Sequence, residues 1–309
     1  MHAFDWFIVV AYFIWIVVDG LWRSKRTTEV EGYFLGGRSL PWWAVGLSVM
    51  ATQMSAITLV GTTGQAYATG FRFIQFYFGL PLAMIILSQT VVPFFHRAGV
   101  YTAYEYLEQR FDAKTRGLVS GIFLMQRGLA LGISLYAPAV VLTVILGWPD
   151  WLTTLLMGSI AVSYATAGGA RTIAWTDFQQ MLIMTAGLIA AFLSAVWLLP
   201  SHVSFTDAVS LADVAGRLNV ITTNFDWNDR YNLWSGLIGG AFLAMAYFGT
   251  DQSQVQRYLA GSDLTQSRLG LLMNAMIKVP MQFLILLLGA LVFVFYQFHA
   301  PPLFFNPGP

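Results

Sequence analysis

Ser48-Val-Met-Ala-Thr-Gln-Met-Ser-Ala-Ile-Thr-Leu-Val-Gly-Thr-Thr-Gly64 is a polar stretch inside an otherwise apolar run that covers residues 40–69. A continuous helix that faces lipid has no use for so many hydroxyl and amide groups. A discontinuous membrane helix uses them, because its unwound backbone exposes carbonyls to a cation and its polar side chains reach a substrate. A buried regular helix whose hydroxyls bond back to its own backbone would have the same composition, and the sequence leaves both interpretations open.

The rest of the chain has the composition of a membrane protein. Of its 309 residues, 57% are hydrophobic and 10% are charged, against roughly 25% charged in a typical soluble domain. A soluble fold of this size could not hide that much apolar surface, so we predict an all-α polytopic membrane protein. The formal net charge of +1 excludes a nucleic-acid-binding surface, and the lack of cysteine excludes disulfides and thiol chemistry.

Eight apolar stretches are long enough to cross roughly 30 Å of hydrocarbon. They lie at about 4–22, 40–69, 73–95, 118–147, 150–168, 172–199, 234–258 and 268–297. Basic residues follow the first stretch and no signal cleavage site does, so we expect a retained span with the N-terminus outside. Alternating loops then place eleven Lys and Arg residues inside and three outside. This asymmetry supports both the count and the orientation, and we expect an integral protein of the plasma (inner) membrane.

Two acidic residues lie within or at the edge of the predicted spans. Asp177 is about one and a half turns into the stretch 172–199, and Asp251 is near the cytoplasmic end of 234–258. A carboxylate in a membrane is costly, which makes both residues functional candidates. The alternatives are a salt bridge of Asp177 with Arg171 or another cytoplasmic base, and a local ion pair of Asp251 with Arg257.

Other motifs narrow the function further. Motifs of nucleotide-binding loops, zinc proteases and serine hydrolases are absent from the sequence, so we expect neither an enzyme nor a cofactor. Three Gly-x-x-x-Gly patterns predict close helix packing. They are Gly117-x-x-x-Gly121, Gly128-x-x-x-Gly132 and Gly236-x-x-x-Gly240.

Several segments, in the right order, resemble the sodium:solute symporter family, which includes the sodium/glucose, sodium/proline and sodium/iodide cotransporters. Besides the polar stretch, they are Tyr33-Phe-Leu-Gly-Gly-Arg-Ser-Leu-Pro-Trp-Trp43, Tyr104-Glu-Tyr-Leu-Glu-x-Arg-Phe111, Gly168-Gly-Ala-Arg-Thr-Ile-Ala-Trp-Thr-Asp177 and Gln252-x-Gln-Val-Gln-Arg-Tyr258. Tyr136-Ala-Pro138 and residues 224–240 are most similar to the branch that carries iodide, multivitamins and monocarboxylates.

The resemblance implies the leucine-transporter-like fold, in which two inverted five-helix repeats follow one extra helix in this family. Substrate and sodium bind where the first helix of each repeat unwinds. Residues 1–22 would be the extra helix, 40–199 the first repeat and 234–298 the start of the second. Residues 1–309 would then form a single transporter domain of about eight transmembrane helices, incomplete and C-terminally truncated.

The resemblance also implies site residues. Sodium would bind the backbone carbonyls of Ala51 and Met54, and Asp177 would lie near the cytoplasmic sodium exit. The other sodium ligands would be hydroxyls and a carbonyl on a helix beyond Pro309. Five side chains would contact or gate the substrate: Gln53, Thr58, Tyr77, Asp251 and Ser253. Tyr77 stands where the glucose branch has a sugar-binding Glu, and Ser253 where it has a gating Tyr. These differences argue against a sugar substrate.

We therefore expect a secondary active symporter that couples inward sodium flow to import of a small organic or anionic solute by alternating access. The lipid bilayer, Na⁺ and the solute would be its partners, with Na⁺ as coupling ion. A channel or a non-transporting membrane sensor on the same spans is the alternative. Gln53 and Thr58 would lie ~140° apart on an unbroken helix. For both to face the substrate, the helix has to unwind around residues 54–56.

Overall fold

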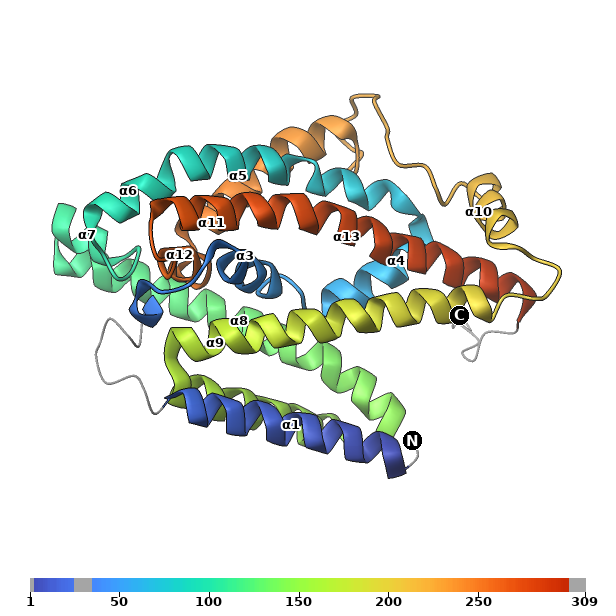
Figure 1. The fold of residues 1–309 in the computed structure, drawn as a ribbon. Helices are drawn as coiled ribbons and strands as arrows, with labels where there is room; N and C mark the ends of the chain where they lie inside the picture. The colour runs from blue at the N-terminus through green and yellow to red at the C-terminus, as the bar shows by residue number, and fades with distance from the viewer. Residues whose placement is uncertain (1–2, 25–34, 300–309) are drawn as a thin grey trace.

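The computed structural model describes residues 3–24 and 35–299, and in these ranges the chain forms helices and no strand (Figure 1). An isolated bridge joins Leu40 to Gly261. Lipid offers no partner for backbone N–H and C=O groups, so each apolar segment has to bond within itself. The predicted all-α fold class is confirmed.

Four helical segments in the described part of the chain are long and apolar enough to cross a membrane. They are Phe71–Ala98, Ala113–Val144, Thr172–Trp197 and Leu264–Phe298. Shorter apolar helices lie at Trp6–Ile16, Trp42–Ala51 and Ser235–Thr250. The count of about eight spans and the outside position of the N-terminus stay predictions. Lys25 and Arg26, which bear on that position, and Tyr33 of the family signature lie outside the described residues.

The polar stretch of the sequence forms a broken helix. α3 (Trp42–Ala51) ends at the unwound residues 52–55, and the chain continues through the π-helical turn η2 (Ile57–Gly61) into α4 (Thr62–Thr69). π-Helical turns are rare and frequently mark functional sites. The predicted unwinding is confirmed, but it covers residues 52–55 instead of 54–56. Ala56 already has helical backbone angles.

A second apolar helix is also broken. η4 (Ser235–Gly239) leads into α11 (Gly240–Thr250), the helix is interrupted at Asp251, and α12 (Gln252–Leu259) follows. Asp251 has extended backbone angles (φ −73°, ψ 119°), and its carboxylate accepts the N–H of Ser253 at 2.8 Å. The side chain of Asp251 therefore caps α12 at the point where the helix restarts.

α13 (Leu264–Phe298) lies beside the first broken helix. Figure 1 shows it in orange-red between α5 (Gly79–Gln89) and α9 (Asp150–Trp197), next to α3 and α4. The approach to α4 is close at Gly289, where a Cβ would lie 2.3 Å from the carbonyl oxygen of Thr63. α13 buries several polar residues in this packing: Ser267, Asn274, Lys278 and Gln282.

The three Gly-x-x-x-Gly patterns do not all give the close helix packing that the sequence predicts. A Cβ on Gly236 would lie 2.0 Å from the carbonyl oxygen of Gln75, and one on Gly240 would lie 2.5 Å from that of Phe76. These glycines thus pack directly on η3 (Phe71–Tyr77), which precedes α5 and α6 (Val91–Ala98). The predicted close packing is confirmed for this pattern. Around the glycines of the other two patterns, Gly117, Gly121, Gly128 and Gly132, no other part of the described chain lies within 4 Å of an added Cβ.

α1 (Ala3–Ser24), α8 (Ala113–Leu146) and α9 (Asp150–Trp197) lie on one side of the molecule. Figure 1 shows the chain turning back within α9, as the two apolar stretches predicted there require. α1 packs on the second part of α9, where Gln179 donates a hydrogen bond to Asp19 at 3.1 Å.

Short helices mark the two ends of the bundle. α10 (Phe205–Val214) begins with a capping box of Ser204 and Asp207 and packs on the C-terminal half of α13. η1 (Gly36–Arg38) and α7 (Glu105–Arg110) lie at the opposite end (Figure 1).

This arrangement gives a direct test of orientation. Ser210 on α10 and Thr265 at the start of α13 are both exposed and lie at opposite ends of the bundle. Because the chain has no cysteine, single cysteines can be introduced at each position. We expect a membrane-impermeant maleimide to label position 210 from outside intact cells and position 265 only after the membrane is opened. Strong outside labelling at 265 would reverse the orientation drawn from the basic residues.

Candidate functional site

A cavity of about 680 Å³ lies beside the first break, bounded by η3, α5, α8 and α11. Its polar and charged lining consists of Thr52, Gln53, Ser55, Tyr77, Arg127, Ser134, Tyr247 and Arg257. The remaining lining is apolar apart from Gly240. A pocket of this size, with apolar walls and a few converging polar groups, is the usual form of a small-molecule site.

The break is held open by hydrogen bonds that no regular helix makes. The hydroxyl of Thr58 donates to the carbonyl oxygen of Gln53 at 2.9 Å, and the N–H of Thr58 lies 3.4 Å from Ser55 Oγ. The amide of Gln53 reaches across to α13, where its Nε2 donates to Asn274 Oδ1 at 3.2 Å. Thr58 therefore stabilises the unwound backbone, while Gln53 joins the break to the neighbouring helix.

Other hydroxyls of the polar stretch bond back to their own helix. Thr52 Oγ1 donates to the carbonyl of Ser48 at 2.8 Å, and Thr62 and Thr63 donate to carbonyls four residues earlier. Gln282 on α13 donates to Thr62 Oγ1 at 3.0 Å. Both interpretations of the sequence thus apply, each to different residues: the stretch is discontinuous, and part of its polarity is structural.

The carbonyls expected to bind sodium lie at the start of the break. Ala51 and Met54 are 8% and 7% exposed, and the Ala51 carbonyl accepts the N–H of Met54 at 2.9 Å. The sulfur of Met54 lies 3.0 Å from Lys278 Nζ, and that ammonium group is 5.8 Å from the centre of the Tyr77 ring. A cation site formed from these two carbonyls needs further oxygen ligands, because hard cations bind several oxygens.

Asp177 forms a compact cluster with two neighbouring elements. Its carboxylate pairs with Arg257 of α12 and accepts the hydroxyl of Ser48 of α3 at 2.8 Å. Arg257 Nη1 also donates to Ser48 Oγ at 2.7 Å. The side chains of Asp177 and Arg257 are 14% and 18% exposed. A salt bridge of Asp177 is therefore present, with Arg257 as partner; the side chain of Arg171 lies outside the described residues.

Asp251 does not pair with Arg257, so the alternative of a local ion pair between these two residues is wrong. Its partner is Arg127 of α8, whose Nη1 lies 3.5 Å from Asp251 Oδ2. Arg127 Nη2 donates to Ser253 Oγ at 2.6 Å, and Ser253 Oγ donates to Asp251 Oδ1 at 2.5 Å. Arg257 is six residues along the chain and is taken by Asp177, so the capping geometry of Asp251 directs its free oxygen to α8.

The five residues predicted at the substrate are thus distributed over three places. Gln53 and Tyr77 line the cavity. Thr58 lies behind it, at the break, while Asp251 and Ser253 bind the cavity residue Arg127 at its α12 end.

Sequence reasoning assigned no role to Arg127, Asn274, Lys278 or Gln282, although all four contact the broken helices. Lys278 is 1% exposed and lies in the middle of an apolar helix. An intramembrane lysine is itself a functional signal, and it could have been used in the same way as Asp177.

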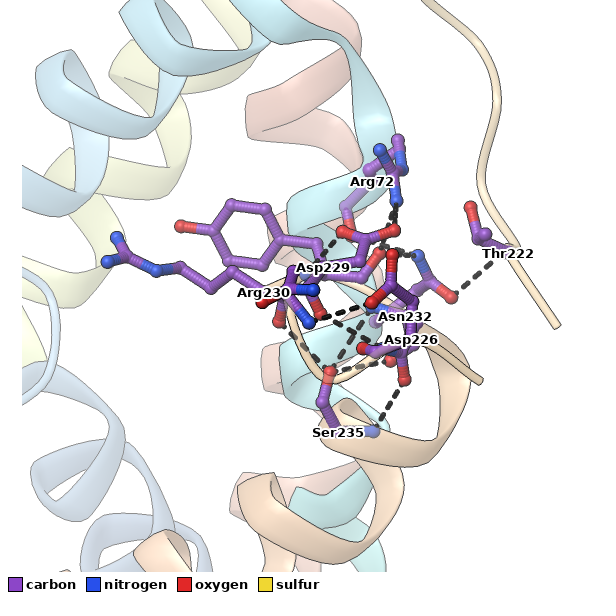
Figure 2. Close-up of polar contacts among 10 residues, drawn as sticks. Arg72, Thr222, Asp226, Asp229, Arg230, Asn232 and Ser235 are labelled. Atoms are coloured by element: carbon purple, nitrogen blue, oxygen red, sulfur yellow. Dashed lines mark hydrogen bonds and ion pairs between the residues drawn. The ribbon is translucent and has the colours of Figure 1, made fainter. Parts of the chain in front are cut away.

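A further polar cluster fixes the loop before η4 to η3 (Figure 2). Arg72 pairs with Asp229 and donates to the carbonyl oxygen of Tyr231 at 2.9 Å. Gln75 is fully buried, donates to the same carbonyl at 3.0 Å and accepts the N–H of Thr222 at 3.0 Å. Together with the glycine contacts, these bonds join the start of the second broken helix to η3.

Comparison with known proteins finds relatives along almost the whole chain. The family model described as the sodium:solute symporter family matches residues 33–306. The chain is 32% identical to the human sodium/iodide cotransporter over 283 residues, which are 92% of this chain and 43% of that protein. It is 35% identical to sodium-coupled monocarboxylate transporter 1 of Xenopus laevis over 246 residues, 79% of this chain and 39% of the relative. The chain thus spans less than half the length of either curated relative.

A solved structure has the same architecture. It is a Na⁺-coupled sialic acid symporter in a substrate-bound, outward-open state, and it superposes with a TM-score of 0.88 at 26% sequence identity. The superposition covers 95% of this chain and 61% of the symporter chain.

Proposed function

Because the chain belongs to the sodium:solute symporter family, we propose that it couples inward sodium flow to import of a small organic or anionic solute by alternating access. The fold is leucine-transporter-like, the protein is an integral membrane protein, and the family consists of transporters rather than enzymes. The proposal includes residence in the plasma (inner) membrane with the N-terminus outside. Residues 1–22 would be the extra helix, 40–199 the first repeat and 234–298 the start of the second.

The observation that carries this proposal is the cavity beside the first break. An unwound segment presents polar side chains to a cavity without exposing its backbone to lipid, which is how transporters of this fold bind ions and solutes at the membrane midplane. Here residues 52–55 border a cavity that also contacts α11, the helix that breaks at Asp251. Two broken helices at one cavity provide the moving parts that alternating access requires.

In the proposed sodium site, the carbonyls of Ala51 and Met54 bind the ion, and Asp177 lies on the path by which it leaves toward the cytoplasm. Three facts support the placement of Asp177. It is held against α3 through Ser48, α3 leads directly to the break, and its carboxylate is one of few negative charges within a membrane-length helix. In the proposed substrate site, Gln53 and Tyr77 contact the solute.

Uptake measurements test the proposal. Cells expressing the protein are given labelled propionate or labelled iodide, chosen because two relatives carry monocarboxylate and iodide in their names. We expect uptake to require an inward sodium gradient and to be accelerated by unlabelled solute on the opposite side. Passage without exchange, equal in sodium and potassium, would instead fit a channel, and no passage of any labelled solute would fit a sensor.

Substitution at the break separates binding from packing. Gln53→Ala removes a side chain that lines the cavity, so we expect a change of several-fold in half-saturation for the solute, together with a partial loss of folded protein because the buried Asn274 loses its donor. Thr58→Ala removes the hydrogen bond to the Gln53 carbonyl. We expect the half-saturation for the solute to change here as well, because the break becomes less ordered. Half-saturation and detergent-extracted yield are measured for both. If only the yield falls, the polar residues serve packing and the binding role is wrong.

A further inference from the structure

The charged side chains that line the cavity are both arginines, Arg127 of α8 and Arg257 of α12. Their partner acids, Asp251 and Asp177, are not among the lining residues. A solute in the cavity therefore meets positive charge at the α12 end, bordered by apolar walls. A neutral solute gains nothing from such a site, whereas an anion would be attracted to it.

The two arginines are bound to very different extents. Arg257 pairs closely with Asp177 and also donates to Ser48. Arg127 is 28% exposed, lies 3.5 Å from a single oxygen of Asp251 and makes its short bond to the neutral hydroxyl of Ser253. A guanidinium has five N–H donors, and these contacts engage one on each Nη atom. Arg127 thus has donors left for a ligand, and its ion pair is the looser of the two.

Asp251 can lose Arg127 without becoming an unpaired buried charge. Its Oδ1 accepts the N–H of Ser253 at 2.8 Å and the hydroxyl of the same residue at 2.5 Å, at the N-terminus of α12. Carboxylates are stable in that position because they cap the helix and face the positive end of its dipole. An exchange of partners at Arg127 therefore leaves both acids, the ligand's and the protein's, with hydrogen bonds.

We propose that Arg127 is the anion-binding group of the cavity, and that a small monoanion such as a carboxylate displaces both Asp251 and the Ser253 hydroxyl from it and so releases α12 from α8. A carboxylate can bind a guanidinium through two parallel N–H···O bonds, which is a stronger contact than the single 3.5 Å approach of Asp251. This inference rests on the proposed function and specifies its solute as an anion.

The ion pairs of α12 would couple transport of the solute to transport of sodium. α12 is fastened to α8 by the contacts of Arg127 with Asp251 and Ser253, and to α9 by the Arg257–Asp177 pair. The solute loosens the contacts of Arg127, and sodium, passing near Asp177, loosens the Arg257–Asp177 pair. Neither ligand alone frees α12, so the broken helix moves only when both are present. The two ion pairs thus make transport of the ion and of the solute depend on each other.

Binding of propionate, with iodide as a second probe and propionamide as the uncharged analogue, tests this inference. Intrinsic tryptophan fluorescence of the purified chain is titrated with each probe in sodium buffer. We expect Asp251→Asn to tighten propionate binding several-fold, because the internal competitor is gone. Arg127→Gln should abolish binding, and Arg127→Lys should retain part of it. Glu108→Gln breaks an exposed ion pair with Arg116 beside the same helix and should change nothing.

Opposite directions for the two partners of one ion pair are the key result, since a purely structural pair would move both variants the same way. The proposal is overturned if Asp251→Asn and Arg127→Gln both weaken binding, if propionamide binds as well as propionate, or if neither anion gives a saturable signal in Asp251→Asn. Repeating the titration in choline separates the two claims. An anion response that is independent of sodium would leave the role of Arg127 intact and count against sodium coupling.

Discussion

In a full-length version of the protein, replacing Asp177 by asparagine is expected to raise the sodium concentration for half-maximal uptake by about tenfold, which corresponds to roughly 1.4 kcal/mol. The substitution removes a negative charge from the proposed sodium path and leaves the guanidinium of Arg257 without its counter-ion. That unpaired positive charge repels the incoming cation. The apparent affinity for the solute should change less, because Asp177 does not line the cavity and the cavity residue Arg257 keeps its hydrogen bond to Ser48.

Two further variants make this result interpretable. Removing one partner of a largely buried ion pair is destabilising, whereas removing both can be nearly neutral. We therefore expect Asp177→Asn with Arg257→Gln to recover folded protein but only part of the sodium affinity, because the repelling guanidinium is gone and the carboxylate is still missing. The exposed pair of Arg116 and Glu108, each 42% exposed, supplies the matched control. Unchanged sodium dependence in a well-folded Asp177→Asn protein would mean that the pair only fastens helices together.

Gly236→Val is expected to eliminate nearly all folded protein. An added Cβ would lie 2.0 Å from the carbonyl oxygen of Gln75, and a backbone atom cannot move aside as the end of a side chain can. The contact holds the second broken helix on η3, so separation there would also pull apart the hydrogen bonds of Gln75. Overpacking of a tight interior commonly costs about 1–3 kcal/mol, and a backbone clash exceeds that range.

Gly132→Val on α8 is the matched control for this substitution. It introduces the same side chain into a membrane-length helix at a position where the described chain leaves 4 Å free. Both variants are compared by the yield of monodisperse protein after detergent extraction. Equal yields would show that the close approach of the two helices contributes little to folding.

The polar residues of the stretch 48–64 were compatible with either a broken or a regular buried helix. The break was predicted only with the family resemblance, which places Gln53 and Thr58 at one site although a regular helix would hold them ~140° apart. The division of the hydroxyls between the break and ordinary back-bonding was not predictable. It depends on Asn274 and Gln282, which approach from a helix more than two hundred residues away in the sequence.

The partners of the two intramembrane acids were likewise not predictable from the sequence. The chemistry of Asp177 and Asp251 was evident from their cost in a membrane, but the choice of partner was not. Arg257 is close to Asp251 in sequence, yet the fold presents it to Asp177, and Arg127 comes to Asp251 from α8. Partner choice is fixed by how α8, α9 and α12 pack, which no spacing along the chain encodes. Close packing at Gly236 was predicted by its motif, while the same motif on α8 found no neighbour in the described part of the chain.

The central claim is that sodium controls which side of the membrane can reach the cavity. A single cysteine at Ser134, which lines the cavity on α8, is labelled by an impermeant maleimide in right-side-out and in inside-out vesicles, with sodium or with choline. The account predicts that sodium speeds labelling from the outside and slows it from the inside, and that Asp177→Asn reduces both effects. Labelling that ignores sodium, or that is fast from both sides at once, would contradict sodium-coupled alternating access.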